Sequence, residues 1–245
     1  MKLSELFETI VGCDVEITSI AFDTREVTSG SLFFCLVGNT RDGHDFLPEA
    51  VKNGAVAAVV EKSQPISIPQ IVVGDARHAL AIAAKKFYGS AADRLSISAV
   101  TGTNGKTTTT YILKSIFEAN GKNVGLIGTN EVSYCGKAHE ASLTTPDPTE
   151  FHRTLADMEN CGVTHVVAEA SAHALALRTL DGIKFAAVGF TNLTRDHLDY
   201  FGDMSAYGAA KASLFDGKRS RAEVINIDDE FGAKLYAERK GAITY

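Results

Sequence analysis

The stretch AVTGTNGKTTTTYIL (99–113) carries the residue types that bind phosphate. An apolar run leads into Gly102 and Gly105, where backbone N–H groups can approach an anion because glycine has no side chain. Lys106 then supplies a positive charge for the outer phosphates, and the Thr107 hydroxyl is placed as a ligand for Mg²⁺. We therefore predict a nucleotide phosphate loop between a strand and a helix. The alternative is a glycine-rich turn that binds nothing.

Four polar side chains further along the chain could complete a metal and nucleotide site. Glu169 follows a buried apolar run, and a carboxylate at the end of a parallel strand is placed to hold a metal, unless it faces solvent. Asn192 ends another predicted strand, so its amide can reach the nucleotide. His197 lies in a loop, where a capping role is an equal alternative because Mg²⁺ prefers oxygen ligands. Lys211 lies on a predicted helix, where most lysines are solvated.

The composition indicates what kind of protein must position these groups. The 245 residues are 45% hydrophobic and 22% charged, as in globular proteins, and can form one large or two ordinary domains. A net charge of -6 and a pI near 5.6 argue against a general nucleic-acid binder. No apolar run reaches the roughly 20 residues that span a membrane. The N-terminal stretch MKLSELFETIV (1–11) predicts an amphipathic helix.

The cysteines bear on the redox compartment. They show no C-x-x-C pair and no partnered histidine spacing, so neither a metal site nor a redox motif is indicated. We expect a cytoplasmic protein with reduced, buried thiols. The residues concerned are Cys13, Cys35, Cys135 and Cys161.

Short apolar strands alternate with helical patterns along the chain, which predicts an α/β fold with mainly parallel sheets. The small, polar stretch 88–94 predicts a boundary between domains at 1–90 and 91–245. We expect strands at 17–22, 31–36, 57–60, 71–73, 95–100, 123–127, 165–170, 186–191 and 222–227. We expect helices at 44–53, 76–88, 107–120, 149–161, 205–215 and 229–239. The pattern of residues 91–245 predicts a doubly wound sheet that stops before its closing strands, so we expect a longer parent protein.

GTNGKTT (102–108) resembles the ATP loop of the Mur ligase family, the ATP-dependent amide-forming enzymes of peptidoglycan precursor synthesis. The usual P-loop pattern places a glycine where Val100 stands, and the family's variant does without it. The resemblance implies a small UDP-binding domain, a P-loop ATPase domain, and a C-terminal domain absent from this chain. It implies ATP contacts at Gly102, Thr103, Asn104, Gly105, Lys106, Thr107, Thr108 and Asn192. It implies catalytic roles for Lys106, Glu169, His197 and Lys211, with Mg²⁺ held by Thr107, Glu169, His197 and Lys211 as N6-carboxylysine.

FDTREVTSGSLFFCLVGNTRDGHDF (22–46) resembles the UDP-sugar-binding domain of the Mur ligases that add a diamino acid to a UDP-muramoyl-dipeptide. Thr24 replaces the serine of the family pattern D-S-R-x-V and keeps a hydroxyl. LTTPDP (143–148) matches the family's paired threonines. Thr179 falls where the family has a basic residue, and Arg178 stands one place early. The resemblance implies contacts to UDP-N-acetylmuramoyl-L-alanyl-D-glutamate at Phe22, Thr24, Asn39, Thr40, Arg41, Thr144, Thr145, Ser171, and Arg178 or Thr179.

The implied activity is phosphoryl transfer followed by amide formation, with ATP and Mg²⁺. The D-glutamate γ-carboxylate attacks the ATP γ-phosphate, and a diamino acid, either meso-diaminopimelate or L-lysine, attacks the acyl phosphate. Two alternatives stay open: another ligase of the superfamily, such as a folylpolyglutamate synthase, and a module that binds without turnover. We expect this polypeptide to bind nucleotide without ligating. The sequence assigns no oligomeric state.

Overall fold

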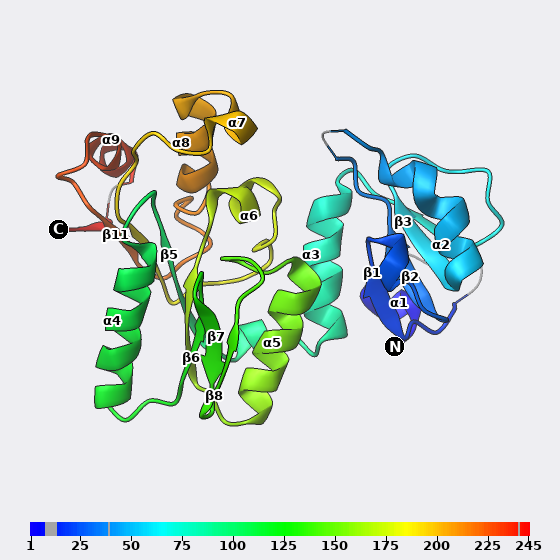
Figure 1. The fold of residues 1–245 in the computed structure, drawn as a ribbon, viewed down its shortest axis with the longest axis horizontal. Helices are drawn as coiled ribbons and strands as arrows, with labels where there is room; N and C mark the ends of the chain where they lie inside the picture. Colours follow the sequence, from blue (N-terminus) through cyan, green and yellow to red (C-terminus); the bar gives the residue numbers. More distant parts are fainter. Residues whose placement is uncertain (8–13, 39, 240) are drawn as a thin grey trace. The chain divides into compact units, whose positions relative to one another are not determined.

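A computed structural model of the chain describes residues 1–7, 14–38, 40–239 and 241–245. The chain divides into two units, Met1–Gly89 and Ser90–Tyr245, and each has its own sheet (Figure 1). Within the described ranges, none of the helices combines the length and the apolar composition needed to cross a bilayer.

The first unit is built on a parallel sheet with both faces covered. Its described strands pair in the order β1-β2-β3-β4. Leu32 and Phe34 of β2 pack into one apolar cluster, while Phe33 of β2 and the following residue, Cys35, pack into the other. Because both faces are buried, the two central strands β2 and β3 are almost entirely apolar and lack the alternation of a half-exposed strand. The strands are β1 (Ser19–Ala21), β2 (Ser31–Phe34), β3 (Ala55–Val60) and β4 (Gln70–Val72).

Helices α1 (Leu3–Leu6) and α3 (Ala76–Phe87) pack into one of these clusters, and α2 (Leu47–Asn53) packs into the other. α3 begins where the Asp75 side chain accepts a hydrogen bond from the N–H of His78. The helix expected at 44–53 is split, since its first turn is the 3-10 helix η2 (Gly43–Phe46). Of the helix expected at 1–11, only Leu3–Leu6 is helical, because the backbone is already extended at Phe7 (φ -126°, ψ 131°). Residues 8–11 lie outside the described residues.

The second unit is a doubly wound, mostly parallel sheet, as the sequence predicts. Its described strands pair in the order β12-β11-β10-β5-β9-β6-β7-β8. The β6–β7 and β7–β8 pairs are antiparallel, and the other described pairs are parallel. The strands are β5 (Ser96–Thr101), β6 (Val124–Ile127), β7 (Glu131–Tyr134), β8 (Lys137–Glu140), β9 (His165–Glu169), β10 (Ala187–Phe190), β11 (Glu223–Ile225) and β12 (Ile243–Thr244). The helices are α4 (Lys106–Ala119), α5 (Pro148–Asn160), α6 (Ala172–Ala176), α7 (Leu198–Phe201), α8 (Met204–Ala212) and α9 (Glu230–Glu238).

Helices α4 and α5 lie on opposite faces of this sheet (Figure 1). Val167 of β9 packs with Phe117 of α4, whereas its neighbours Val166 and Ala168 pack with Phe151 of α5. The carboxyl ends of β5, β9 and β10 are adjacent, since β5 lies between the other two strands. In a doubly wound sheet this edge is where ligands bind.

Two features of the second unit differ from the sequence-based expectations. The β7–β8 hairpin was not predicted, because β8 is exposed along its whole length and has no apolar pattern. Cys135 in its turn and Cys161 at the end of α5 are exposed and form a disulfide, with an S–S distance of 2.08 Å. The expectation of buried, reduced thiols is therefore wrong for this pair. It is confirmed for Cys35, which is free and buried, and Cys13 lies outside the described residues.

Candidate functional site

The glycine-rich loop joins β5 to α4 with a geometry that requires glycine. Gly102 has a φ of 147°, and a Cβ built on it would lie 1.8 Å from Thr191 Oγ1. Gly105, the N-cap of α4, has a φ of 84°. The loop can therefore approach the end of β10 closely while leading into the first turn of a helix. The N–H groups of such a turn lack intrahelical partners and are suited to bind phosphate.

The residues after β10 hold the loop in this shape. The N–H of Thr103 donates to the Asn192 carbonyl (2.8 Å), and the N–H of Asn104 donates to the Asn192 side-chain oxygen (3.0 Å). Thr191 Oγ1 donates to the Asn104 carbonyl (2.6 Å). Asn192, expected at the nucleotide, thus lies directly against the phosphate loop.

Two lysines converge on one carbonyl oxygen of the loop. Lys106 Nζ donates to the carbonyls of Gly102 and Thr103, both at 2.9 Å, and Lys211 Nζ donates to the Gly102 carbonyl at 2.8 Å. Lys211 is 1% exposed and lies 4.4 Å from the ring centroid of Tyr207. The burial of Lys211 excludes the alternative of a solvated helix lysine.

This environment changes the protonation of both amines. Burial, followed by the charge of Lys106, lowers the pKa of Lys211 to about 7. Burial also lowers the pKa of Lys106, against the opposing charges of Glu169 and Asp196. Near neutral pH, a large share of Lys211 is therefore an uncharged amine.

Glu169 ends β9 with its carboxylate fully buried, so the solvent-facing alternative is wrong. Both carboxylate oxygens accept hydrogen bonds from Thr129, which donates its N–H to Oε1 (2.9 Å) and its hydroxyl to Oε2 (3.0 Å). A Cβ on the preceding Gly128 would lie 2.6 Å from Oε1. Neither Gly128 nor Thr129 was singled out from the sequence.

His197 is the N-cap of α7, with a φ of 53°, and its side chain is 47% exposed. Its ring centroid lies 4.7 Å from that of His173 on α6 and 6.0 Å from that of Tyr207. Burial, and then the charge of His197, lowers the pKa of His173. Sequence reasoning missed His173, although its position four residues after Glu169 was a usable signal. Through Tyr207, this ring cluster reaches Lys211.

These donors fit Mg²⁺ that is held partly by nucleotide. Among the described residues, no group of three or more His, Cys, Asp or Glu side chains could hold a metal ion by itself. In nucleotide sites Mg²⁺ keeps several waters and uses one or two carboxylates together with phosphate oxygens. Glu169 suits this role because each carboxylate oxygen can accept more than the single hydrogen bond from Thr129. Thr107 stands in the first turn of α4, where a hydroxyl can reach a phosphate-bound cation.

Three of the residues expected at the muramoyl-peptide surround the end of β9. Thr144 Oγ1 lies 3.1 Å from Thr129 Oγ1. Thr145 is buried, donates its hydroxyl to the Glu169 carbonyl (2.7 Å) and accepts the N–H of Ser171 (3.0 Å). The Thr145 hydroxyl, which we expected to contact the precursor, therefore hydrogen-bonds to the backbone at the end of β9.

The other two expected precursor residues follow α6. Arg178 has a φ of 60° and donates to the Asp181 carboxylate (2.7 Å). Thr179 is 4% exposed, and its N–H donates to the Ala174 carbonyl (2.9 Å). Of the two, Arg178 is the more accessible, since its side chain is 44% exposed.

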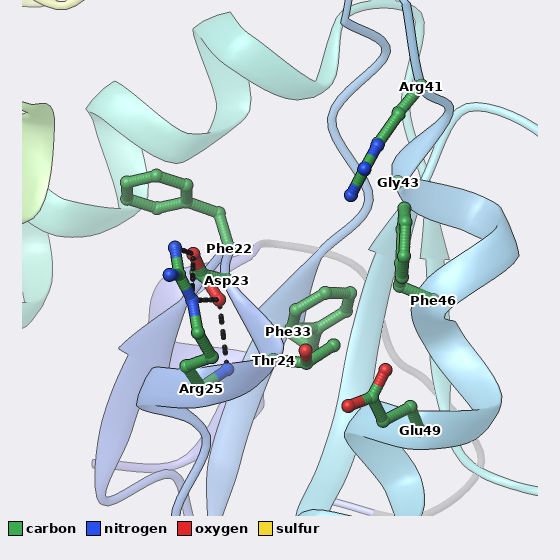
Figure 2. Close-up of a pocket in the computed structure, with 9 residues that line it drawn as sticks. All are labelled: Phe22, Asp23, Thr24, Arg25, Phe33, Arg41, Gly43, Phe46 and Glu49. Atoms are coloured by element: carbon green, nitrogen blue, oxygen red, sulfur yellow. Dashed lines mark hydrogen bonds and ion pairs between the residues drawn. The ribbon is translucent and has the colours of Figure 1, made fainter.

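In the first unit, residues expected to bind UDP line a cavity of about 480 Å³ (Figure 2). The lining residues are Phe22, Asp23, Thr24, Arg25, Phe33, Arg41, Gly43, Phe46 and Glu49. Phe22, Thr24 and Arg41 are thus brought together. Thr40 is exposed in the bend beside Arg41, and Asn39 lies outside the described residues.

The charges of this cavity are partly paired. Arg25 Nε donates to both Asp23 carboxylate oxygens (2.9 and 3.0 Å), which holds the pKa of Asp23 at about 2. Figure 2 shows this pair on one side of the cavity and the Arg41 guanidinium on another. The cavity therefore offers aromatic rings, a hydroxyl and a cation, a combination suited to a nucleoside diphosphate.

Comparisons with known proteins extend these observations. The Mur ligase middle domain matches residues 100–245, and the Mur ligase family catalytic domain matches residues 16–88. The chain is similar to the UDP-N-acetylmuramoyl-L-alanyl-D-glutamate--2,6-diaminopimelate ligase of Solibacter usitatus, at 44% identity over 90% of this chain and 46% of the relative. The ligase of the same name from Halalkalibacterium halodurans is 42% identical over 95% of this chain and 50% of the relative. The chain spans about half the length of these curated relatives.

A solved structure of a UDP-N-acetylmuramoyl-L-alanyl-D-glutamate--2,6-diaminopimelate ligase has a similar fold. It superposes with a TM-score of 0.85 and 26% identity, covering 99% of this chain and 50% of the other. The similarity of fold therefore extends through both units.

Proposed function

Since the chain belongs to the Mur ligase family, we propose that it forms the precursor-binding and ATP-binding part of a ligase that adds a diamino acid to UDP-N-acetylmuramoyl-L-alanyl-D-glutamate. The curated relatives are named for this reaction with 2,6-diaminopimelate, which favours diaminopimelate over L-lysine as the incoming amine. The precursor's D-glutamate γ-carboxylate attacks the ATP γ-phosphate, and ADP leaves. The amine then displaces phosphate from the acyl phosphate and forms the amide. Because the reaction consumes ATP, we place the protein in the cytoplasm.

The observation that carries this proposal is the meeting of two lysines at the Gly102 carbonyl of a phosphate loop. Phosphoryl transfer between two anions requires charge neutralisation and alignment more than covalent chemistry. Lys106 would supply positive charge at the phosphates. A phosphate bound in the loop would replace the carbonyls of Gly102 and Thr103 as the acceptors of its amine.

Lys211 has the properties of a lysine that can be carboxylated. Its neutral amine can add to CO₂ and release a proton, which forms a carbamate anion. A side chain that is a cation when protonated thereby becomes an anion. The pKa of about 7 makes this form of the amine available at neutral pH. Inside the site, the resulting anion would face the ammonium of Lys106.

Glu169, Thr107, His197 and carboxylated Lys211 are the residues that would hold Mg²⁺ at the nucleotide. The ion would supply positive charge between the phosphates and the attacking carboxylate. Glu169 is held for this by Thr129, while Asn192 fixes the loop against which the nucleotide lies.

In the first unit, we propose that the cavity binds the UDP group of the precursor. Arg41 would pair with the diphosphate and Thr24 would donate a hydrogen bond, while Phe22 and Phe46 offer apolar surface to the uridine. Thr144, Ser171 and Arg178 would contact the muramoyl-peptide in the second unit.

Calorimetric titration of the chain with ATP and Mg²⁺, and separately with the UDP-precursor, tests the proposal. We expect both ligands to bind. Lys106→Met should weaken ATP binding at least tenfold without affecting the precursor. Lys122→Met, which removes an exposed lysine just beyond the far end of α4, should bind both ligands like the wild type. An absence of ATP binding by the wild-type chain would refute the nucleotide assignment.

Phosphate release in the presence of ATP, precursor and either diaminopimelate or L-lysine tests the ligase reaction itself. Release that requires both the precursor and an amine would show ligation and identify the amine. Binding of both ligands without release would support the alternative of a module that binds without turnover.

A further inference from the structure

The Glu169 carboxylate is held in place by hydrogen bonds from Thr129, which lies in the turn between β6 and β7. Thr129 gives this one carboxylate its N–H (2.9 Å) and its hydroxyl (3.0 Å). Since Glu169 is 0% exposed, bulk water cannot replace either donor. Loss of the hydroxyl would leave a buried, charged oxygen without one of its partners, which is costly enough to move the side chain.

The backbone of the same turn approaches the carboxylate closely. A Cβ on Gly128 would lie 2.6 Å from Glu169 Oε1 and 3.4 Å from its Cδ. The N–H of Gly128 donates to the Glu131 carbonyl (3.1 Å) at the start of β7, which fixes the turn. The turn therefore determines where the carboxylate lies through one close contact and two hydrogen bonds.

The hydroxyl of Thr129 also links Glu169 to Thr144. The two threonine Oγ1 atoms are 3.1 Å apart. A threonine hydroxyl has a single proton, and a carboxylate is a stronger acceptor than another hydroxyl. The Thr129 hydroxyl is placed to donate to either group, and its single proton favours the carboxylate of Glu169.

We infer that Thr129 is a positioning residue that orients the Glu169 carboxylate toward the divalent cation of bound ATP. This inference rests on the proposed function, because it assumes that Glu169 meets a nucleotide-bound cation. Thr129 itself acts only through Glu169. Partners of this kind behind a metal ligand typically change metal affinity by ~10–100-fold.

The test measures the affinity of the chain–ATP complex for Mn²⁺ by electron paramagnetic resonance, and that of the chain for ATP in EDTA by calorimetry. Thr129→Val should weaken Mn²⁺ binding about tenfold and leave ATP binding in EDTA within about twofold. Thr129→Ser should restore Mn²⁺ binding, since it keeps the hydroxyl. The control is Thr164→Val, which removes a hydroxyl at the opposite end of β9 and should behave like the wild type.

Gly128→Ala tests the position of Glu169 independently of Thr129, because the added Cβ would displace the Glu169 carboxylate while Thr129 is retained. It should reproduce the loss of Mn²⁺ affinity. Wild-type Mn²⁺ affinity in Thr129→Val or in Gly128→Ala would overturn the inference. If the wild-type chain itself binds ATP equally well with Mn²⁺ and with EDTA, the proposed function fails at its metal step. The two failures are distinguishable because the second appears without any substitution.

Discussion

Lys211 should make the stability of this protein depend on pH in a direction opposite to that of a surface lysine. Its pKa is about 7 in the folded chain, against 10.5 as the ordinary value, because the amine is buried and faces Lys106. Below pH 7 the lysine is protonated in both states, and the full cost of burying its charge is present. Between pH 7 and 10.5 only the unfolded chain binds the proton, so the free energy of unfolding rises with pH.

The magnitude follows from these two pKa values. One proton difference between the states corresponds to about 1.4 kcal/mol per pH unit. The folded-state amine is half protonated at pH 7, so the gain from pH 7 to pH 9 is about 2.3 kcal/mol. Lys211→Met removes the titrating group and should remove this gain while filling a similar volume.

Urea denaturation of both proteins at pH 7, 8 and 9 measures the effect. Buffers free of CO₂ and containing EDTA keep the amine unmodified and the site free of divalent cations. The stability of the wild type relative to Lys211→Met should rise by about 2.3 kcal/mol over this range. Parallel pH dependences would show that the folded-state pKa is ordinary, and the argument from burial would be refuted.

Two further predictions concern the loop and the disulfide. Gly102→Ala should abolish ATP binding in calorimetry, because its Cβ would lie 1.8 Å from Thr191 Oγ1. The control is Gly136→Ala, since Gly136 also has a positive φ but a Cβ there would meet no atom within 4 Å. This variant should lower stability without weakening ATP binding. Equal ATP affinity in the two variants would contradict this reading of the loop. Reduction of the Cys135–Cys161 bond, whose cysteines are 26 residues apart in sequence, should lower the free energy of unfolding by about 3.5 kcal/mol, measured by urea denaturation with and without dithiothreitol. Cys135→Ser should be insensitive to dithiothreitol, and equal sensitivity of both proteins would count against the bond.

The sequence was most informative where burial acts on every residue of an element. The central strands are apolar because both faces of their sheets are covered, and α4 was expected at 107–120 and is found at Lys106–Ala119. The β7–β8 hairpin was not predicted, because β8 is exposed and lacks the alternation of apolar and polar residues that indicates a half-buried strand. The disulfide was not predicted, because the distance between two cysteines 26 residues apart in sequence depends on tertiary packing.

The same limit applies to the candidate site. Glycines, Lys106 and the strand-end Glu169 can be found by motif because their positions follow from the local strand-to-helix geometry. Thr129 cannot be found in this way, because it contacts Glu169 across 40 residues of sequence. His173 stands in sequence near Glu169, but its ring contact with His197 depends on how α6 and α7 pack.

The burial of Lys211 connects the chemistry of this site to its charge balance. A protonated Lys211 adds a second cation beside Lys106, and that repulsion contributes to its lowered pKa. Loss of the proton removes the repulsion and yields the nucleophilic form of the amine. In the proposed carboxylation, the charge changes sign, so the same neighbour that disfavours the ammonium would attract the carbamate. Bicarbonate should therefore stabilise the wild-type chain in thermal melting and leave Lys211→Met unchanged. Equal shifts in both proteins would show that bicarbonate acts elsewhere.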